Sequence, residues 1–174
     1  MVFLRNTALK ENRGLKELAG EVFTKILVPV DGSKYSQDAA EYAVKIARLV
    51  NAKLVVLHVL HRPAYAFTYS ASSGSPVAIP APLPLEVSDD EKKVGKELVD
   101  SVRKIADKAG VDVETMLVEH NPSVPDAIIQ FASEAGVDLI VIGTKGRTGI
   151  KRFLLGSVTE SVVHHAHCPV LVVR

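Results

Sequence analysis

The segment from Gly143 to Ser157, with the sequence GTKGRTGIKRFLLGS, has the residue types of an anion-binding loop. It follows an apolar run and leads into a segment of helical period, whose N-terminus would carry partial positive charge. Glycines allow backbone N–H groups to approach an anion closely. Four cationic side chains add to this charge: Lys145, Arg147, Lys151 and Arg152. The segment predicts a polyphosphate site; the alternative is an ordinary strand-to-helix loop with a glycine turn and a serine cap.

Two common phosphate-binding motifs are absent from the chain. It contains neither G-x-x-x-x-G-K-S/T nor G-x-G-x-x-G. The chain therefore lacks the lysine and the Mg²⁺-binding hydroxyl of the P-loop nucleoside triphosphatases. It also shows no nucleophile elbow and no serine beside a base. We assign no catalytic residue.

Two further groups of polar residues have types that could do chemistry. Asp31 ends an apolar run in the sequence Asp-Gly-Ser, which is either a turn that starts a helix or a ligand contact near the glycine loop. His164, His165, His167 and Cys168 are metal-ligand types, but neighbours in sequence point to different faces of an element. Histidines at a helix end also favour the helix dipole. We therefore expect no metal at this cluster.

Five short runs rich in Val, Ile and Leu predict strands that are buried on both faces, as in a parallel sheet. They are Lys25–Val30, Lys53–Val59, Val111–Val118, Val137–Ile142 and Pro169–Val173. Segments of helical period lie between or beside them at residues 36–50, 88–109, 124–135 and 157–166. This alternation predicts an α/β fold with helices on both faces of an open parallel sheet. The run at Val111–Val118 alternates more with polar residues, so we expect it near an edge.

Local signals predict where the helices begin and end. Gly110 predicts the C-terminal end of the second helix. Ser123 with Asp126, and Ser157 with Glu160, have the spacing of capping boxes. Each of the last two helices is therefore expected to begin with a serine N-cap.

Composition and charge exclude several classes of protein. The 174 residues are 47% hydrophobic and 24% charged, which is a globular balance and not that of a disordered chain. The net charge of +1 argues against general binding to nucleic acid or to an anionic membrane. One cysteine cannot form an intrachain disulfide, and no apolar run approaches the roughly 20 residues of a membrane span. With no secretory pattern at the N-terminus, we expect a cytoplasmic protein.

Two segments lie outside the expected core. Residues 1–23 form an N-terminal extension before a domain at residues 24–174. A Pro-rich insert at residues 60–85 separates the second strand from the second helix and holds Tyr65, Phe67 and Tyr69. A connection of this length is either a mobile loop or a functional flap or partner surface.

The spacing Gly143-x2-Gly146-x9-Gly156-Ser157 matches the nucleotide-binding signature of the universal stress protein family. The sequences ILVPVDGS at 26–33, LHV at 57–59 and CPVLVV at 168–173 resemble the first, second and last strands of that family. The resemblance covers about residues 24–174. The chain departs from the family in its N-terminal extension, in its Pro-rich insert, and at residues 120–125, where HNPSVP replaces a frequent Gly-x-Pro turn.

The resemblance implies a Rossmann-like sheet of the adenine nucleotide alpha hydrolase type, with five strands in the order 3-2-1-4-5. Strands one and four are then neighbours whose crossovers run in opposite directions, and such sheets bind ligands at that switch point. The family pattern also implies which residues bind the nucleotide. Pro29, Val30 and Val59 would contact adenine, Asp31 would face the ribose or phosphates, Ile142 and Gly143 would border the ribose, and Gly146, Gly156, Ser157, Val158 and Thr159 would hold the phosphates.

Three functions are compatible with these features. The first is a stress-response regulatory protein that binds ATP, ADP or AMP, with or without Mg²⁺ or Mn²⁺, as a nucleotide-dependent switch. The second is a slow metal-dependent ATPase or phosphotransfer enzyme that uses Asp31. The third is an interaction module that uses no nucleotide. The glycines argue against it, because only a close ligand would explain three of them at these spacings together with a serine cap. The resemblance also implies a homodimer through the final strand, Val170–Val173, an apolar strand expected at a sheet edge.

Overall fold

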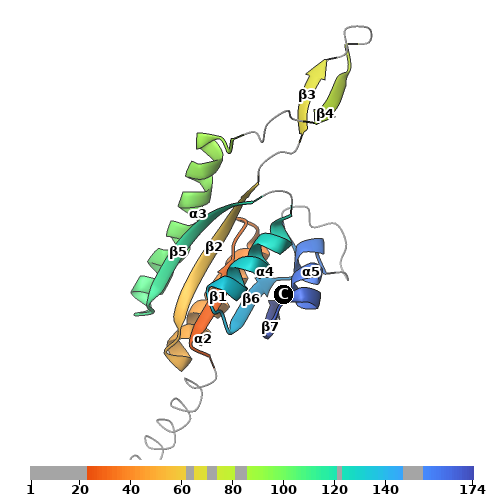
Figure 1. Cartoon of the computed structure of the whole chain (residues 1–174). Coiled ribbons are helices and arrows are strands. Elements are labelled where there is room, and N and C mark those ends of the chain that lie inside the picture. Colours follow the sequence, from red (N-terminus) through yellow and green to blue (C-terminus); the bar gives the residue numbers. More distant parts are fainter. Residues whose placement is uncertain (1–22, 62–64, 70–73, 81–85, 121–122, 147–154) are drawn as a thin grey trace, which may run out of the picture.

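The five predicted strands form one parallel sheet in the computed structural model of the chain (Figure 1). The structure describes residues 23–61, 65–69, 74–80, 86–120, 123–146 and 155–174. The strands are β1 (Lys25–Pro29), β2 (Lys53–His61), β5 (Val113–His120), β6 (Leu139–Gly143) and β7 (Val170–Val173). They lie in the order β5-β2-β1-β6-β7, and each neighbouring pair is parallel. The expected strand order 3-2-1-4-5 is confirmed.

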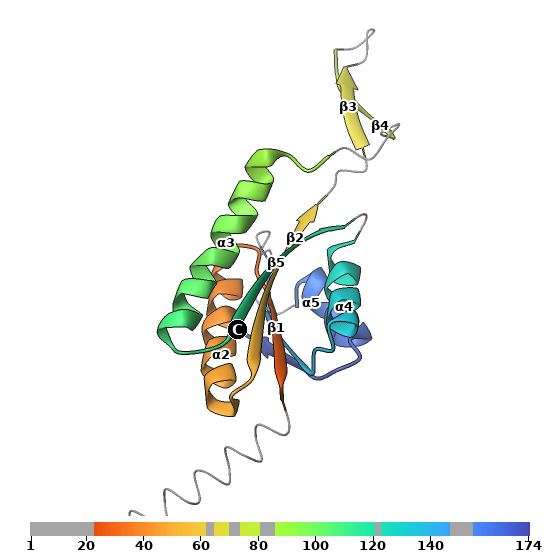
Figure 2. The same ribbon diagram turned by 60° about the vertical axis from the view of Figure 1, so that its left-hand side comes forward.

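Helices cover both faces of the sheet. They are α2 (Lys34–Val50), α3 (Asp89–Lys108), α4 (Val124–Glu134) and α5 (Ser157–His165). α2 and α3 lie on one face, and α4 and α5 lie on the other (Figure 2). In β1, Ile26 and Val28 pack with α2 and α3, whereas Leu27 packs with α4 and α5, because successive strand residues point to opposite sides. In the described part of the chain, no helix has both the length and the apolar character of a bilayer span.

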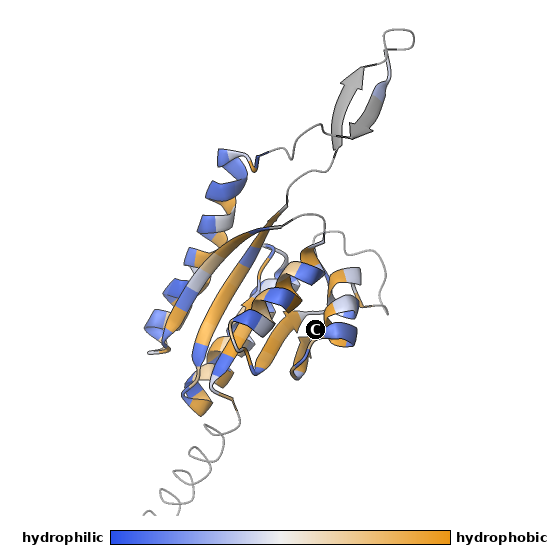
Figure 3. Ribbon diagram, viewed as in Figure 1, coloured by the Kyte–Doolittle hydropathy of each residue, from blue (hydrophilic) through white to orange (hydrophobic). Residues whose placement is uncertain are grey.

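The hydropathy of the elements matches this layered arrangement. The central strands are hydrophobic on both faces, and the outward faces of the helices are hydrophilic (Figure 3). All five residues of β6 are buried. A parallel sheet that is covered on both faces requires this composition, since neither side of its central strands meets water.

Serine side chains cap the N-termini of three helices. The hydroxyls of Ser33, Ser88 and Ser123 accept hydrogen bonds at 3.2, 3.2 and 3.5 Å from the backbone N–H three residues further along. The predicted cap at Ser123 is therefore confirmed. Gly110 follows the end of α3 at φ +71°, a left-handed conformation that favours glycine and ends the helix as predicted.

The predicted serine cap of α5 is wrong. The N-cap is Gly156, which makes no side-chain capping bond, and Ser157 is already the first residue of the helix. The Gly156 carbonyl accepts a hydrogen bond from Glu160 N at 2.8 Å, and Gly156 N donates to the Thr144 carbonyl at 2.8 Å. The backbone at Gly156 is therefore bonded to the residue that follows β6, and the N-cap of α5 lies one residue earlier than the capping-box spacing suggests.

β5 lies at one edge of the sheet, as its alternating sequence predicted, and β7 lies at the other. Lys53 Nζ on β2 lies 2.7 Å from Glu114 Oε2 on β5. This ion pair raises the pKa of Lys53 and lowers the pKa of Glu114. β2 runs two residues beyond its predicted end, to His61, and stays paired with β5 to that point.

The Pro-rich insert contains a hairpin that the sequence analysis did not predict. β3 (Tyr65–Tyr69) and β4 (Pro76–Pro80) pair antiparallel in a separate two-stranded sheet, which projects away from the main sheet (Figure 1). Pro76 and Pro80 stand at the two ends of β4, where a missing N–H is tolerated. The prolines prevented the prediction of this hairpin, because a proline inside an apolar run usually argues against a strand. Residues 62–64, 70–73 and 81–85, and the predicted extension up to residue 22, lie outside the described residues.

α2 and β6 approach each other closely at Gly143. A Cβ at this position would lie 2.6 Å from the Tyr35 carbonyl oxygen and 3.0 Å from Ser36 N, both in the first turn of α2. The rest of the buried face of α2 is also made largely of small residues: Ala39, Ala40, Ala43 and Ala47. The packing of helix on strand therefore requires a glycine here.

We expect Gly143→Ala to lower the free energy of unfolding by about 1–3 kcal/mol, because the new methyl group must displace backbone atoms. Gly156→Ala is the matched control, since Gly156 has φ −68° and a Cβ there would make only ordinary contacts of 3.4 Å or more. Urea unfolding followed by circular dichroism measures both variants. Equal stability of the two would contradict this account of the α2–β6 contact.

Asp138 joins the starts of β1 and β6. Its Oδ2 accepts hydrogen bonds from Thr24 N and Thr24 Oγ1, each at 2.7 Å, and its Oδ1 accepts one from Lys25 N at 3.0 Å. The two carboxylate oxygens thus satisfy two backbone donors that precede the first ladder bonds of β1. Charge-assisted bonds of this kind are stronger than those between neutral groups.

We expect Asp138→Asn to destabilise the fold by about 1–2 kcal/mol. The amide nitrogen of asparagine would replace one of the two carboxylate oxygens, and it cannot accept the hydrogen bond from the backbone N–H that faces it. Asp107→Asn, at an exposed position in α3, removes the same charge without these partners. Thermal and urea unfolding of both variants test this, and a loss of stability equal to that of Asp107→Asn would show that the Asp138 bonds contribute nothing.

Candidate functional site

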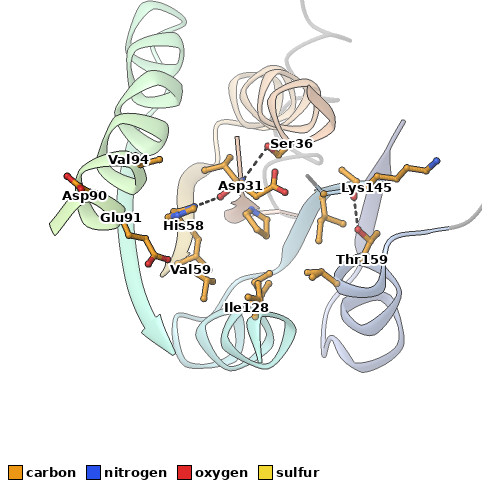
Figure 4. A pocket seen from close by; sticks show the side chains of 18 residues that line it. Asp31, Ser36, His58, Val59, Asp90, Glu91, Val94, Ile128, Lys145 and Thr159 are labelled. Carbon is orange, nitrogen blue, oxygen red and sulfur yellow. Dashed lines mark hydrogen bonds between the residues drawn. The ribbon is translucent and has the colours of Figure 1, made fainter. Parts of the chain in front are cut away.

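A pocket of about 570 Å³ opens at the carboxyl ends of β1, β2 and β6 (Figure 4). β1 and β6 are neighbours whose following helices, α2 and α5, cover opposite faces of the sheet, so the pocket lies at the topological switch point. Nine of the eleven residues that the sequence analysis singled out line it. They are Pro29, Val30, Asp31, Val59, Ile142, Gly143, Gly146, Val158 and Thr159.

The other two, Gly156 and Ser157, do not line the pocket and lie at the start of α5, next to the lining residue Val158. The first turn of α5 faces the pocket through Val158 and Thr159. The N–H groups of a first helical turn have no partners within their helix, and the helix dipole makes this end partially positive. This end of the pocket therefore offers hydrogen-bond donors to an anion.

Asp31 holds a turn and also faces the pocket. Its Oδ1 accepts a hydrogen bond from Ser33 N at 3.0 Å, and Asp31 N donates to Ser36 Oγ at 3.4 Å (Figure 4). Its Oδ2 would lie 2.9 Å from a Cβ at Gly146. The two interpretations of Asp31, as a turn residue or as a ligand contact, are thus compatible, because one oxygen stabilises the turn and the other faces the glycine loop.

The three spaced glycines have different structural reasons. Gly143 is needed for the contact with α2, and a side chain at Gly146 would displace the Asp31 carboxylate. Neither of these contacts involves a ligand, so the inference that only a ligand explains all three glycines is wrong. Gly156 alone has ordinary surroundings and an ordinary backbone conformation.

Thr159 and Lys145 differ in how they contribute to the pocket. Thr159 is buried, and its Oγ1 donates a hydrogen bond to the Gly143 carbonyl at 2.6 Å, which ties α5 to β6. Lys145 accepts a hydrogen bond from Ser33 Oγ through its carbonyl at 3.3 Å, and its side chain extends away from the centre of the pocket (Figure 4). The other cationic residues of the loop, Arg147, Lys151 and Arg152, lie outside the described residues.

One wall of the pocket was not predicted. It comes from α3, with Asp90, Glu91 and Val94, and from His58 on β2. α3 follows the long Pro-rich insert, so nothing in the spacing of the glycine motif points to it. The signal that could have found it is Gly95, a glycine inside a helix, because a Cβ there would lie 2.7 Å from His58 Cδ2.

The histidines near the end of α5 have separate partners. His165 Nδ1 lies 2.9 Å from the Ser161 carbonyl, and His167 Nε2 lies 3.1 Å from the Val137 carbonyl. Burial, with the nearby charge of Asp138, raises the pKa of the Cys168 thiol, so the metal-binding thiolate is disfavoured there. Across the residues that the structure describes, no three His, Cys, Asp or Glu side chains are grouped to hold a metal ion.

The pocket combines an apolar middle with two polar ends. Val59, Val94 and Ile128 form apolar walls, α5 presents backbone donors at one end, and α3 presents carboxylates at the other. The arrangement suits a flat apolar ring joined to an anionic group.

Comparisons with known proteins agree with this fold. The model of the universal stress protein family matches residues 23–174. Universal stress protein MJ0531 of Methanocaldococcus jannaschii is 38% identical over 154 residues, which cover 88% of this chain and 83% of the relative. The structure of universal stress protein UspA from Lactobacillus plantarum matches with a TM-score of 0.67 and 31% identity, over 87% of this chain and 98% of that chain.

A structure of the universal stress protein from Archaeoglobus fulgidus in complex with dAMP matches with a TM-score of 0.63 and 25% identity, over 88% of this chain and 99% of that chain. The sheet order, the family model and the identity to MJ0531 all lead to the same assignment. This chain belongs to the universal stress protein family.

Proposed function

We propose that this protein binds an adenine nucleotide (ATP, ADP or AMP) in the pocket at the switch point and acts as a regulatory protein of the stress response. The observation that carries the proposal is the pocket itself, with apolar walls that lead to the N-terminus of α5. The dAMP complex of the Archaeoglobus fulgidus relative supports an adenine nucleotide as the ligand.

The geometry supports one placement of the nucleotide. The phosphates lie at the first turn of α5 and at Gly146, where backbone N–H groups and the helix dipole favour an anion. The ribose lies between Asp31 and Ile142. The base lies between Val59, Val94 and Ile128, where a flat ring replaces water against apolar side chains.

Asp31 is the side chain that would share a metal ion with the phosphates. Mg²⁺ in nucleotide sites is commonly held by one or two carboxylates together with phosphate oxygens, so one carboxylate at this end of the pocket fits that role. Bound there, Mg²⁺ or Mn²⁺ would neutralise phosphate charge. Asp31 itself is held in place by its bond from Ser33 N.

We expect Val94→Trp to weaken nucleotide binding while the fold is kept. Val94 is 47% exposed on α3 and lines the apolar part of the pocket, so a larger side chain fills the space of the base without entering the core. Overpacking of this kind costs about 1–3 kcal/mol, which is roughly a 5- to 150-fold rise in Kd. Isothermal titration calorimetry with AMP, ADP and ATP, with and without Mg²⁺, measures it.

Leu49→Trp is the control, because Leu49 is 59% exposed on α2 and does not line the pocket. Chromatography of nucleotides released from freshly purified, denatured protein shows which phosphate state the protein retains. A wild-type protein that binds none of the three nucleotides would refute the proposal. ATP turnover that Asp31→Asn abolishes at unchanged affinity would instead identify a slow hydrolase.

We also propose that the protein is a homodimer through β7 and that nucleotide binding changes the surface it offers to partners. Among the strands that the structure describes, β7 pairs only with β6, and Leu171 on it is 39% exposed. The carbonyls of Pro169 and Val173 accept bonds from the β6 side, so the N–H groups of Val170 and Val172 point to the open edge. An apolar edge with open hydrogen-bonding groups favours pairing with a second copy.

We expect Val172→Pro to convert the dimer to a monomer, because it removes an edge N–H without touching the bonds to β6. Val172→Ala keeps that N–H and is expected to stay dimeric. Light scattering at micromolar concentration measures the mass against the 18.7 kDa of one chain. A monomeric wild-type protein would contradict the dimer, and it would leave the nucleotide site untouched.

A further inference from the structure

α2 carries a row of apolar side chains on its solvent side. Tyr42 is 52% exposed and Leu49 is 59% exposed, and Ile46 between them is only partly buried. Residues three, four and seven apart lie on one side of a helix, so these three form a continuous row, which we call the α2 stripe. Single apolar residues are common on protein surfaces, whereas a contiguous group of them is typical of a surface that packs against something.

The α2 stripe ends close to the point where the described chain begins. Phe23 packs against the same core cluster that contains Val50 and Ala52, the residues that follow the stripe. The Thr24 carbonyl accepts a hydrogen bond from Lys53 N at 2.9 Å. The N-terminal extension therefore leaves the body beside the last turn of α2, and its 22 residues are attached there.

The sequence of the extension contains an apolar row of the same length. Its last eight residues place apolar side chains at the spacing of one helix face: Leu15, Leu18, Ala19 and Val22. This row covers about 10 Å of helix, as does the α2 stripe. A helix this short is not stable by itself in water, so its apolar face needs a surface on which to pack.

The charges beside the two rows are complementary. The second half of α2 carries Lys45 and Arg48, both exposed, and no acidic residue. The last six residues of the extension carry Glu17 and Glu21 and no basic residue. An extension that turns back along α2 brings this acidic stretch beside the basic one. The exposed pair of Lys45 with Glu41, at 4.0 Å, is of a kind that contributes little and does not hold Lys45 in place.

We propose that the last eight residues of the N-terminal extension pack their apolar face on the α2 stripe of the same chain. Tethering favours this occupant over a second copy, because a segment that is joined to the body next to its site has an effective concentration in the millimolar range. Neither Tyr42 nor Leu49 lines the pocket at the switch point. The inference is therefore independent of the proposed nucleotide function.

Tryptophan fluorescence tests the contact, because the chain has no tryptophan of its own. In the full chain, we expect Leu18→Trp to give an emission maximum well to the blue of that of the unfolded chain, because the indole packs against apolar side chains. The maximum should stay unchanged on dilution, since the contact lies within one chain. Adding Leu49→Asp places a charge in the stripe and should shift the emission to the maximum of the unfolded chain.

Ile105→Asp is the matched control, because it places the same charge at an apolar position of α3 that is 44% exposed. It should leave the emission of Leu18→Trp unchanged. Tyr42→Asp tests the other end of the stripe and should act like Leu49→Asp, and circular dichroism checks that each variant keeps the fold.

Two results would overturn the inference. One is an emission maximum of Leu18→Trp equal to that of the unfolded chain, or one that both substitutions in the stripe leave unchanged. The other is a blue-shifted emission that is lost on dilution together with a fall in mass by light scattering, which would identify a second copy as the occupant.

Discussion

The contact between the first turn of α2 and the end of β6 fixes the geometry of the site. Gly143 allows the backbone at Tyr35 to approach the strand within a distance that any side chain would prevent. From the same point, the Gly143 carbonyl accepts the Thr159 hydroxyl at 2.6 Å, and Ser33 Oγ donates to the Lys145 carbonyl at 3.3 Å. α2, β6 and α5 are therefore tied together at one corner, and the pocket opens beside it.

Because of this corner, the same residues serve stability and the pocket wall. Asp31 stabilises a turn with one oxygen and faces the glycine loop with the other, and Thr159 lines the pocket while its hydroxyl joins two elements. If substitution of such a residue abolished ligand binding, displacement of the pocket wall would explain the result as readily as a lost contact with the ligand. Val94, which lines the pocket and is 47% exposed on α3, separates the two effects.

Much of the fold followed from sequence patterns, because the signals were local. Apolar runs located the strands of the main sheet, and the serine at position 123 located the start of α4. The order of the strands came from the resemblance, since no local signal carries it. The α5 cap was misassigned because the bond between Gly156 N and the Thr144 carbonyl is a tertiary contact. The wall from α3 was missed for a similar reason: Gly95 is explained by its close contacts with His58 and Leu60, which lie on another element.

The two ends of the pocket differ in hydrogen-bonding character, and this difference fixes the orientation of a ligand. The start of α5 offers donors, whereas Asp90 and Glu91 place carboxylates at the α3 end. A nucleotide bound in reverse would place phosphate oxygens beside carboxylates, where like charges repel. The apolar walls between the ends, Val59, Val94 and Ile128, favour burial of a ring in either direction. The middle of the pocket therefore favours burial of an apolar ring, and the polar ends determine which way round a ligand with an anionic group would bind.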